Sequence, residues 1–250
     1  MVDEVSIASN FAEHFQIVIA NESKVNEAFK IRHEVYAREL GWEPIRDSGM
    51  ETDEFDSGSM HLLLLHRRSE MYAGCIRLVC SDNQGEISLL PFETHCSEVI
   101  EESRLNLTEL HQLSYGEISR LAVPEQFRRR QGEAKMPFVM NEFNPASLFT
   151  KSEMRAVPNI ALGLYMGSLC LASLNHQQFV FALMESRLCR RLRRLGIMFE
   201  SVSDAIEWRG SRMVYRLEVA TIEQNLPTPI HDLYRILYES LAGHPSLIRQ

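Results

Sequence analysis

The sequence contains no apolar run long enough to cross a membrane. Its most apolar stretch, Ile160 to Leu174, is interrupted by Gly163, Gly167 and Ser168. It is also shorter than the ~20 residues that a bilayer-spanning helix requires. Residues 1–15 carry acidic side chains where a secretory signal would place a basic region and an apolar core. We therefore expect a cytoplasmic protein without a membrane span, in which residues 160–174 form a buried helix.

Cysteine pairs and metal-binding motifs are also missing. The five cysteines form no CxxC pair, and such isolated cysteines are typical of reduced structural thiols rather than of a disulfide framework or a zinc site. There is no HExxH, GxSxG, GxxxxGK or GxGxxG motif, which leaves metalloproteases, nucleophile-elbow hydrolases and phosphate-loop enzymes unsupported. We expect no metal and no tightly bound cofactor.

An excess of positive charge is absent as well, because the formal net charge is -8. A protein of this charge is not a general binder of nucleic acid or of anionic membranes. The composition is that of an ordinary globular protein, with 45% hydrophobic and 24% charged residues among 250. No repeat, low-complexity tract or linker divides the chain, so residues 1–250 are expected to form a single domain.

The hydrophobic pattern predicts an α/β (α+β) fold, with antiparallel strands early in the chain and a strand–helix–strand crossover late. Strands are expected at residues 15–20, 61–66, 71–79, 115–123, 178–184, 198–207 and 211–220. Helices are expected at residues 21–40, 160–175, 186–195 and 231–241, the last of which would dock onto the domain. Residues 135–157 have poor periodicity and contain Pro137 and Pro145, which indicates an inserted loop or lid.

Arg32 lies inside the apolar stripe of the expected helix 21–40, close to Val35 and Tyr36. A charged group on the core side of a helix is costly unless it is paired. Arg32 should therefore face a carboxylate or a substrate.

The segment after the strand at 115–123 is rich in arginine and contains Gly132. Residues 129–134 fit the R/Q-x-x-G-x-G/A loop of GNAT acyltransferases. In such a loop a strand runs into a glycine turn and then a helix, so that backbone N–H groups can hold a phosphate. A solvated basic turn would have the same sequence features, and both interpretations stay open here.

Several short motifs follow one another in a fixed order along the chain. They are Arg32 with Val35 and Tyr36; Leu40, Gly41 and Trp42; Glu51, Asp53, Phe55 and Asp56; Gly74 with Arg77; Phe92; and Glu117, Ser119 and Arg120. The ordered set resembles the acyl-homoserine-lactone (autoinducer) synthases and the N-acyl amino acid synthases, with Tyr36 where those synthases usually carry phenylalanine. Residues 159–174, 179–200 and 210–219 look most like the acyltransferases associated with PEP-CTERM/exosortase systems.

This resemblance implies a GNAT-like fold, with a mixed central sheet splayed between two halves and flanked by helices. It also implies transfer of a long-chain fatty acyl group from an acyl carrier protein or CoA thioester to the amine of a small molecule. No cysteine lies in residues 43–60 or 117–123, so we expect direct attack by the amine without a covalent enzyme intermediate. The acceptor stays open between S-adenosylmethionine, a free amino acid such as tyrosine, and another amine.

The same resemblance implies candidate site residues. The candidates for catalysis are Glu51, Glu117, Asp53, Arg77 and Arg120. The candidates for substrate binding are Arg32, Tyr36, Trp42, Asp56 and Phe92. The candidates for holding the acyl donor and its pantetheine arm are Leu121, Ala122, Val123, Arg129, Arg130, Gly132 and Ala134. The candidates for docking an acidic acyl carrier protein are Arg128, Arg187, Arg190, Arg191 and Arg194.

Glu51 is the first choice as the base that assists the amine, and Glu117 is the second. In a regular strand Glu117 and Arg120 would point to opposite faces. A β-bulge near Ser119 to Ala122 would let both serve one cleft and would expose backbone N–H groups to the thioester carbonyl. We expect such a bulge, with those N–H groups as the oxyanion donors.

Simpler interpretations of these residues also stay open. The acids of residues 51–56 could form a solvated turn, the arginines could be structural ion-pair partners, and the basic helix 186–195 could be a solvated face. Trp42 and Phe92 could belong to the core. Two other functions also stay open, namely an acetyl-CoA-dependent acetyltransferase and a non-catalytic sensor of acyl ligands with the same fold.

Overall fold

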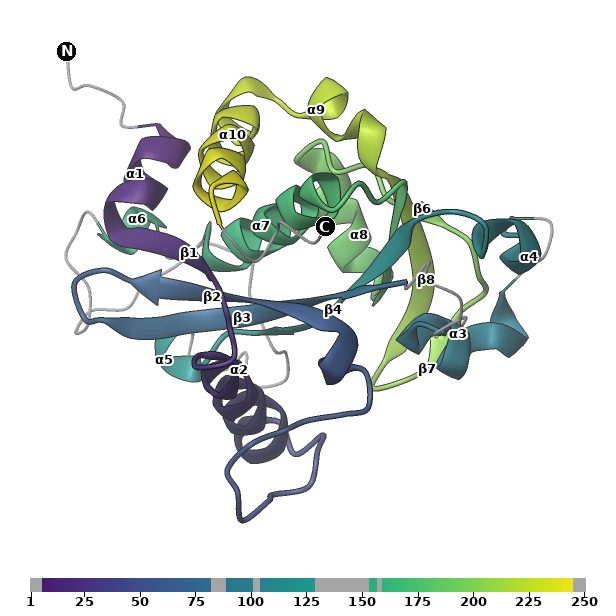
Figure 1. Cartoon of the computed structure of the whole chain (residues 1–250), viewed down its shortest axis with the longest axis horizontal. Coiled ribbons are helices and arrows are strands. Elements are labelled where there is room, and N and C mark those ends of the chain that lie inside the picture. Colours follow the sequence, from purple (N-terminus) through teal and green to yellow (C-terminus); the bar gives the residue numbers. More distant parts are fainter. Residues whose placement is uncertain (1–5, 82–88, 101–103, 129–152, 157–158, 245–250) are drawn as a thin grey trace.

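A single mixed sheet crosses the molecule, with helices on both of its faces (Figure 1). The computed structural model describes residues 6–81, 89–100, 104–128, 153–156 and 159–244. The strands are β1 Phe15–Ile19, β2 Ser59–His66, β3 Met71–Cys80, β4 Tyr115–Ala122, β5 Phe179–Met184, β6 Glu200–Ser201, β7 Ile206–Glu207 and β8 Ser211–Glu218. Their order in the sheet is β1-β2-β3-β4-β5-β8-β6, and β7 pairs with β8 outside this path. The expected mixed α/β fold is confirmed.

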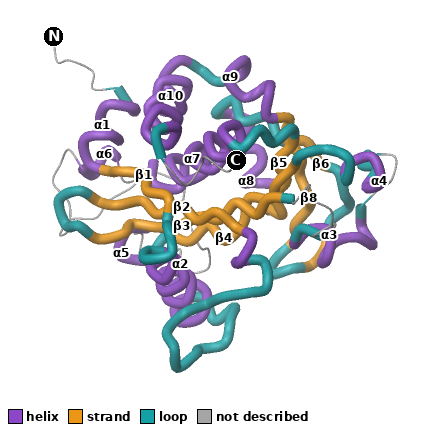
Figure 2. The backbone as a smooth tube through the Cα atoms, viewed as in Figure 1, coloured by secondary structure: helices purple, strands orange, loops and turns teal. Residues whose placement is uncertain are grey.

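Two layers of helices cover the sheet. In Figure 1 the upper layer holds α1 Ile7–His14, α7 Ile160–Leu174, α8 Ser186–Arg194 and α10 Thr228–Ala242, and α2 Val25–Arg32 lies below the sheet. The shorter helices are α3 Pro91–Cys96, α4 Leu107–Leu110, α5 Glu125–Arg128, α6 Glu153–Ala156 and α9 Ile222–Asn225. Single 3-10 turns occupy Asp56–Gly58, Ser97–Val99 and Val219–Thr221. Figure 2 shows the long loop between α2 and β2 running below the sheet.

The sheet divides between β4 and β5, which are its one parallel pair of neighbours among the described strands. Their pairing covers Tyr115 to Glu117 on β4 and Phe179 to Phe181 on β5. Both strands continue further, to Ala122 and Met184, without pairing to each other there. Strands that pair over only part of their length must diverge over the rest. The expected splay between an antiparallel half and a crossover half is therefore confirmed.

The central helix of the upper layer is α7, which is buried on nearly all sides. It packs between the sheet and α10, and an apolar sequence with small residues suits such a position. A side chain at Gly163 would begin 2.2 Å from the Phe11 ring of α1, so this glycine allows close helix packing. Helix α10 begins at Thr228, with Pro229 in its first turn, three residues before the start expected for the docking helix. No helix in the described part of the chain is long and apolar enough to cross a membrane.

The helix expected at residues 21–40 is present, but it changes type half-way. After α2, residues His33–Glu39 form a wider π-helical turn, in which the Leu40 N–H donates to the Val35 carbonyl at 3.1 Å. The helix then ends at Gly41, whose φ of +64° is accessible to glycine at little cost. Such wide turns are frequent at functional sites. Periodicity in the sequence does not distinguish this turn from an ordinary α-helix.

One expectation about the second half needs correction. Residues 198–207 do not form one strand, because β6 ends at Ser201 and Ser203 then accepts a hydrogen bond from the Val214 N–H through its side chain. Most of the expected insertion at 135–157 lies outside the described residues. Near its end lies α6, where the buried carboxylate of Glu153 accepts two hydrogen bonds from Arg68 on the β2–β3 turn.

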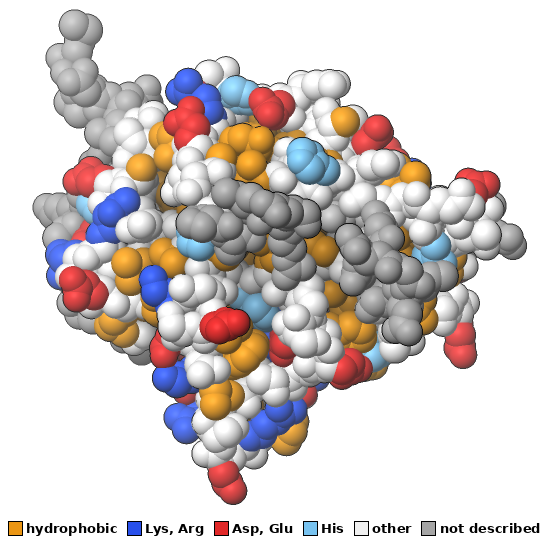
Figure 3. Space-filling model, in the orientation of Figure 1, with side chains coloured by type: hydrophobic (Ala, Val, Ile, Leu, Met, Phe, Trp, Pro, Cys, Tyr) orange, Lys and Arg blue, Asp and Glu red, His pale blue; other side chains and the backbone are white. Residues whose placement is uncertain are grey.

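Charged side chains of both signs are interspersed on the molecular face shown in Figure 3. One apolar core extends from α1 to α10. This arrangement agrees with a globular protein of moderate negative charge.

Gly74 on β3 offers a test of the packing beside the divided sheet. A methyl group there would lie 2.8 Å from the Ala122 carbonyl oxygen and 2.9 Å from Leu164. We expect Gly74→Ala to lower the free energy of unfolding by about 1–3 kcal/mol, since the backbone oxygen has little room to move. Chemical denaturation measures the change. Gly58→Ala is the matched control, because that site is open space and should be close to neutral; an equal loss in both variants would contradict the prediction.

Candidate active site

A cleft opens where β4 and β5 diverge. It encloses about 1140 Å³ of empty space, including the open solvent at its mouth. One part of its wall is charged and aromatic and comes from the loop after α2, from β3 and β4, and from the turn between β7 and β8. The other part is apolar and comes from α7, α8 and the ends of β4 and β5. The cleft therefore joins a polar region to an apolar one through the gap in the sheet.

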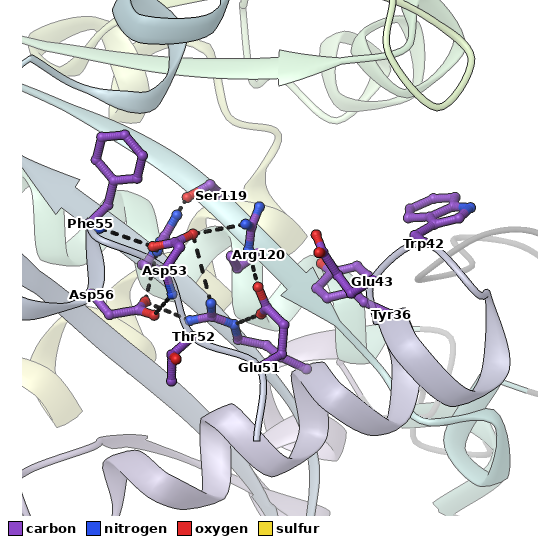
Figure 4. Close-up of polar contacts among 12 residues, drawn as sticks. Tyr36, Trp42, Glu43, Glu51, Thr52, Asp53, Phe55, Asp56, Ser119 and Arg120 are labelled. Atoms are coloured by element: carbon purple, nitrogen blue, oxygen red, sulfur yellow. Dashed lines mark hydrogen bonds and ion pairs between the residues drawn. The ribbon is translucent and has the colours of Figure 1, made fainter. Parts of the chain in front are cut away.

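Arg32 of α2 stands at the centre of a buried cluster of charges. Figure 4 shows Glu51, Asp53, Asp56 and Arg120 of this charge cluster lying close together. Its Nε donates to Glu51, its Nη1 donates to Asp56 at 2.6 Å, and its Nη2 lies 3.8 Å from Asp53. Burial alone would lower the pKa of Arg32, but the two hydrogen-bonded carboxylates raise it overall. The expectation that this arginine meets a carboxylate is confirmed.

Two arginines of the sheet complete this charge cluster. Arg77 on β3 donates from Nη1 to Asp53 at 2.5 Å and to Asp56 at 2.7 Å, and from Nε to Ser119 at 3.1 Å. Arg120 on β4 donates to Asp53 at 2.8 Å, and its Nε lies 3.3 Å from a Glu51 oxygen. The cluster therefore holds three arginines and three carboxylates, whose formal charges cancel.

The two aspartates of this charge cluster are held ionised. Burial by itself would raise the pKa of Asp56, but the hydrogen bond and charge of Arg32, with Arg77, hold it at about 2. The pKa of Asp53 is likewise lowered overall by Arg77 and Arg120, against the effect of burial. An aspartate with a pKa this low is a poor proton acceptor at neutral pH. These acids therefore suit a structural and electrostatic role, and the loop they occupy is not a solvated turn.

The expected β-bulge is present in β4. Ser119 pairs with Arg77 and Ala122 pairs with Cys75, so two residues of β4 face one residue of β3. Arg120 in the bulge has a φ of +55°, which is unusual for a residue with a side chain. The bulge brings Arg120 to the same cleft as Glu117, since both line it.

Glu117 lies in the wall of the cleft at the last paired residue of β4. Its side chain is only 3% exposed, and its Oε2 accepts a hydrogen bond from the Phe92 N–H at 2.7 Å. Burial raises the pKa of Glu117 to about 7, although the Phe92 N–H and the nearby Arg77 and Arg120 act against this rise. By contrast, Glu51 is directly paired with Arg32 and does not belong to the cleft wall.

The aromatic candidates serve both the core and the cleft. Phe92 lines the cleft and stacks on Phe181 with ring centroids 4.4 Å apart. Trp42 also lines it and stacks on Tyr36 at 6.1 Å. The Tyr36 hydroxyl does not face the cleft freely, because it donates to the Leu121 carbonyl in the bulge at 2.8 Å. Burial raises the pKa of Tyr36, so this hydroxyl keeps its proton.

The turn between β7 and β8 closes one side of the cleft, which the sequence did not indicate. Arg209 in this turn donates to the Trp42 carbonyl at 2.9 Å and to Glu43 at 2.7 Å. These hydrogen bonds join two segments that lie far apart in the sequence. Arg212 on β8 also lines the cleft and lies over the Trp42 ring at 5.7 Å. Gly210, with a φ of +99°, marks a turn in the sequence, but nothing in the sequence shows that the turn reaches Trp42.

Only some of the residues expected to hold the acyl donor or to dock its carrier protein lie within the described part of the chain. Leu121 lines the cleft, whereas Ala122 and Val123 are buried in the core. Arg129, Arg130, Gly132 and Ala134 lie outside the described residues. No group of side chains suited to a metal ion is present within the described residues.

The arginines expected at a carrier-protein surface do not lie together. Arg128 is buried and paired with Glu39, and its helix α5 lies below the sheet in Figure 1, whereas α8 lies above it. Burial lowers the pKa of Arg128 to about 10. This is a correction to its expected place beside α8, because Arg128 instead fastens α5 to the end of the helix at residues 33–39. On α8 the exposed arginines include Arg187, Arg190 and Arg194, while Arg191 is half-buried.

Comparison with known proteins finds similarity to acyltransferases. Residues 31–137 match the family model of the acetyltransferase (GNAT) domain. An acyl-homoserine-lactone synthase from Aeromonas salmonicida is 34% identical over 67 residues, which are 26% of this chain and 32% of that protein. The match thus spans about a third of the curated relative. The acetyltransferase domain agrees with the acyltransferase that the sequence led us to expect.

Solved structures extend the likeness over most of the chain. FeeM, an N-acyl amino acid synthase from uncultured soil microbes, superimposes with a TM-score of 0.53 at 12% identity, covering 86% of this chain and 96% of FeeM. BjaI, a CoA-dependent acyl-homoserine lactone synthase solved with SAM and isopentyl-CoA, superimposes with a TM-score of 0.54 at 16% identity, covering 94% of this chain and 91% of BjaI. The expected GNAT-like fold is therefore confirmed.

Removing Arg32 should test whether the charge cluster holds the loop in place. We expect Arg32→Met to lower the free energy of unfolding by about 3–5 kcal/mol, since it leaves the buried Glu51 and Asp56 without their partner. Lys30→Met is the control, because Lys30 on the same helix pairs with Glu27 at the exposed surface, where an ion pair is worth about 0–1 kcal/mol. Denaturant titration of both variants measures the difference. A loss below about 1 kcal/mol for Arg32→Met would contradict the proposed role of the cluster.

Glu117 should make stability depend on pH. In the unfolded chain this carboxyl loses its proton near its ordinary pKa of 4.5, whereas in the folded chain it keeps the proton up to about 7. Between these values the folded state binds more protons, so stability falls as pH rises. We expect a loss of about 2–3 kcal/mol between roughly pH 5 and pH 8 that Glu117→Gln removes.

The measurement is denaturant titration of both chains across this pH range. Comparison of the two slopes isolates Glu117, because all other titrating groups are shared. Parallel stability curves for the two chains would show that the folded pKa of Glu117 is ordinary.

Proposed function

We propose that the chain is an N-acyltransferase that moves a long-chain fatty acyl group from a thioester to the amine of an amino acid or a related small molecule. The observation that carries the proposal is Glu117, a buried carboxyl with a pKa of about 7 in the wall of the cleft at the division of the sheet. A base whose pKa lies near neutrality can accept a proton and still be ionised under working conditions. The GNAT domain match and the synthase-like fold supply the reaction class.

In the proposed reaction the neutral amine attacks the thioester carbonyl carbon. The carbon–nitrogen bond forms, the carbon–sulfur bond breaks, and Glu117 accepts the proton that the amine nitrogen loses. Glu117 then gives up this proton, and the departing thiolate takes it up and leaves as the free thiol, so the products are an amide and the thiol of the carrier. We assign the oxyanion that forms during attack to backbone N–H groups of the bulge at residues 119–122.

The charge cluster supports this reaction by positioning its parts. Arg77 and Arg120 belong to both the charge cluster and the cleft wall. The buried carboxylates therefore fix the positions of two side chains that line the cleft. Tyr36 fixes the Leu121 carbonyl and thereby the peptide geometry of the bulge. We therefore propose Glu51 as a positioning residue that orients Arg120, and Glu117 as the base.

The apolar part of the cleft wall supports a fatty acyl donor. Leu121, Tyr165, Met184 and Leu188 line the cleft and are otherwise buried in the core. A long acyl chain placed against these side chains would remove its own apolar surface from water, which is favourable by about 25 cal/mol for each Å² buried. An acetyl group has little apolar surface to bury in this way. The polar part of the wall, with Trp42 and Asp53, is left for the amine.

We propose an acyl carrier protein as the protein that presents the donor. The exposed arginines Arg187, Arg190 and Arg194 on α8 support this, since carrier docking to an acidic partner depends on complementary charge. Arg187 also pairs with Glu185 at 2.8 Å, which fixes its position at the start of α8. We also propose that the activity belongs to a PEP-CTERM/exosortase system. The basis is the likeness to acyltransferases of such systems in residues 159–174, 179–200 and 210–219.

Replacing Glu117 tests the proposed function. We expect Glu117→Gln to lower kcat/KM for amide formation by a factor of about 100 or more, because the amine then loses the carboxylate that accepts its proton. The kcat/KM of the unchanged chain should rise with pH through an apparent pKa of about 7, and this rise should vanish in the variant. Thiol release from acyl thioesters, with amide formation followed by mass spectrometry, measures both.

The same assay separates the proposal from its rivals. Glu51→Gln is the comparison variant, and it should retain the pH profile even if its rate is lower, since a positioning residue does not titrate in the reaction. Preference for acetyl-CoA over long-chain donors on CoA or carrier protein would overturn the long-chain assignment. Thioester binding without amine-dependent thiol release across amino acids and S-adenosylmethionine would show a sensor instead of an enzyme.

A further inference from the structure

The arginines that line the described part of the cleft wall have ion-pair partners, with one exception. Arg77 and Arg120 are paired with Asp53. Arg209 is paired with Glu43. Within the described residues, Arg212 is the cleft-lining arginine whose side chain makes neither an ion pair nor a hydrogen bond.

Arg212 is held in place although its charge is not compensated. It is half-buried near the start of β8, and its guanidinium lies over the Trp42 ring at 5.7 Å. Its Nε is buried and has no hydrogen-bond acceptor. A buried donor without an acceptor costs about 1–3 kcal/mol. The cleft therefore keeps an unsatisfied cationic donor in its wall.

The groups around Arg212 do not supply the missing partner. The nearby charges are Glu185, which already pairs with Arg187, and Arg209, whose like charge is unfavourable. Tyr36 and Tyr165 are also close, but burial raises the pKa of both and keeps them neutral. Burial lowers the pKa of Arg212 itself, as it does for a cation without a counter-ion. A bound anion would remove this cost.

Another arginine of β8 also lies over an aromatic ring, so stacking alone does not distinguish Arg212. Arg216 lies four residues further along β8 and stacks over the Phe179 ring at 5.2 Å. It does not belong to the cleft wall, and its Nε is not among the buried donors without an acceptor. Arg212 differs in facing the cleft. This difference is what a ligand-binding arginine requires.

We propose that Arg212 binds an oxyanion carried by a substrate, either the carboxylate of an amino-acid acceptor or the phosphate of the donor's pantetheine arm. Arginine suits both, because its planar donors match the oxygens of a carboxylate or a phosphate. The ring of Trp42 lies 5.7 Å from the guanidinium carbon, and this contact favours a guanidinium held beside the cleft. The choice between these two ligands rests on the proposed acyl transfer, whereas the cationic site follows from the structure.

Binding measurements with defined probes test this site without depending on turnover. The acceptor arm compares N-decanoylglycine with N-decanoylglycinamide, which lacks the carboxylate. The donor arm compares decanoyl-phosphopantetheine with decanoyl-pantetheine, which lacks the phosphate. Isothermal titration calorimetry of the full chain gives Kd for each probe. Arg212→Gln removes the charge, Arg212→Lys keeps it without the planar donors, and Arg216→Gln is the matched control.

We expect the unchanged chain to prefer the anionic member of one pair by about tenfold to a hundredfold, the range for a hydrogen bond to a charged group. Arg212→Gln should reduce that preference to about one, Arg212→Lys should retain part of it, and Arg216→Gln should leave it unchanged. The pair that shows the preference identifies the substrate.

Two results would overturn the proposal. One is the absence of any preference for the anionic probes in the unchanged chain. The other is a preference that persists in Arg212→Gln. If Arg212 behaves as expected but no amine-dependent thiol release occurs, the anion site stands and the proposed reaction fails.

Discussion

The buried charge cluster is the constraint on which the cleft depends. Arg32 of α2, Arg77 of β3 and Arg120 of β4 are joined there by carboxylates of one loop. Removing so many charges from water is costly, so the cluster is stable only if each guanidinium and each carboxylate keeps its partner. This requirement fixes the loop of residues 43–58 against the sheet, although the loop contains little regular structure. A polar cleft wall with a definite shape follows from that fixed loop.

The second constraint is the short parallel pairing of β4 with β5. Because it stops at Glu117, the strands diverge, and the space between them connects the charge cluster on one face with the apolar core of α7 on the other. Glu117 thus sits at the point where pairing ends, buried by the strands around it and facing the gap. The bulge immediately beyond it turns Arg120 toward the same space. The short pairing of β4 with β5 and the bulge in β4 together place polar and apolar side chains in the wall of one cleft.

Much of this arrangement could be expected from the sequence, because certain residues do not suit the helix or strand in which the hydrophobic pattern places them. Arg32 within an apolar stripe required a buried carboxylate, and the spacing of Glu117 and Arg120 required a bulge if both served one cleft. The partner of Arg209 could not be expected, because its contact with Glu43 joins segments that are far apart in the chain and carry no shared pattern. The burial of Arg128 was missed for the same reason, since its partner Glu39 lies on another helix.

The difference between Glu51 and Glu117 explains why burial alone does not identify a base. Both carboxyls are nearly inaccessible to solvent, but Glu51 accepts from one arginine and lies beside a second, whereas the bond of Glu117 is to a neutral peptide N–H. Desolvation without an ion-pair partner raises the pKa of a carboxyl and so strengthens it as a proton acceptor. Sequence motifs rank the two acids by their place in a pattern. The fold places Glu117 in the cleft wall with a pKa of about 7, and this combination favours Glu117 as the base.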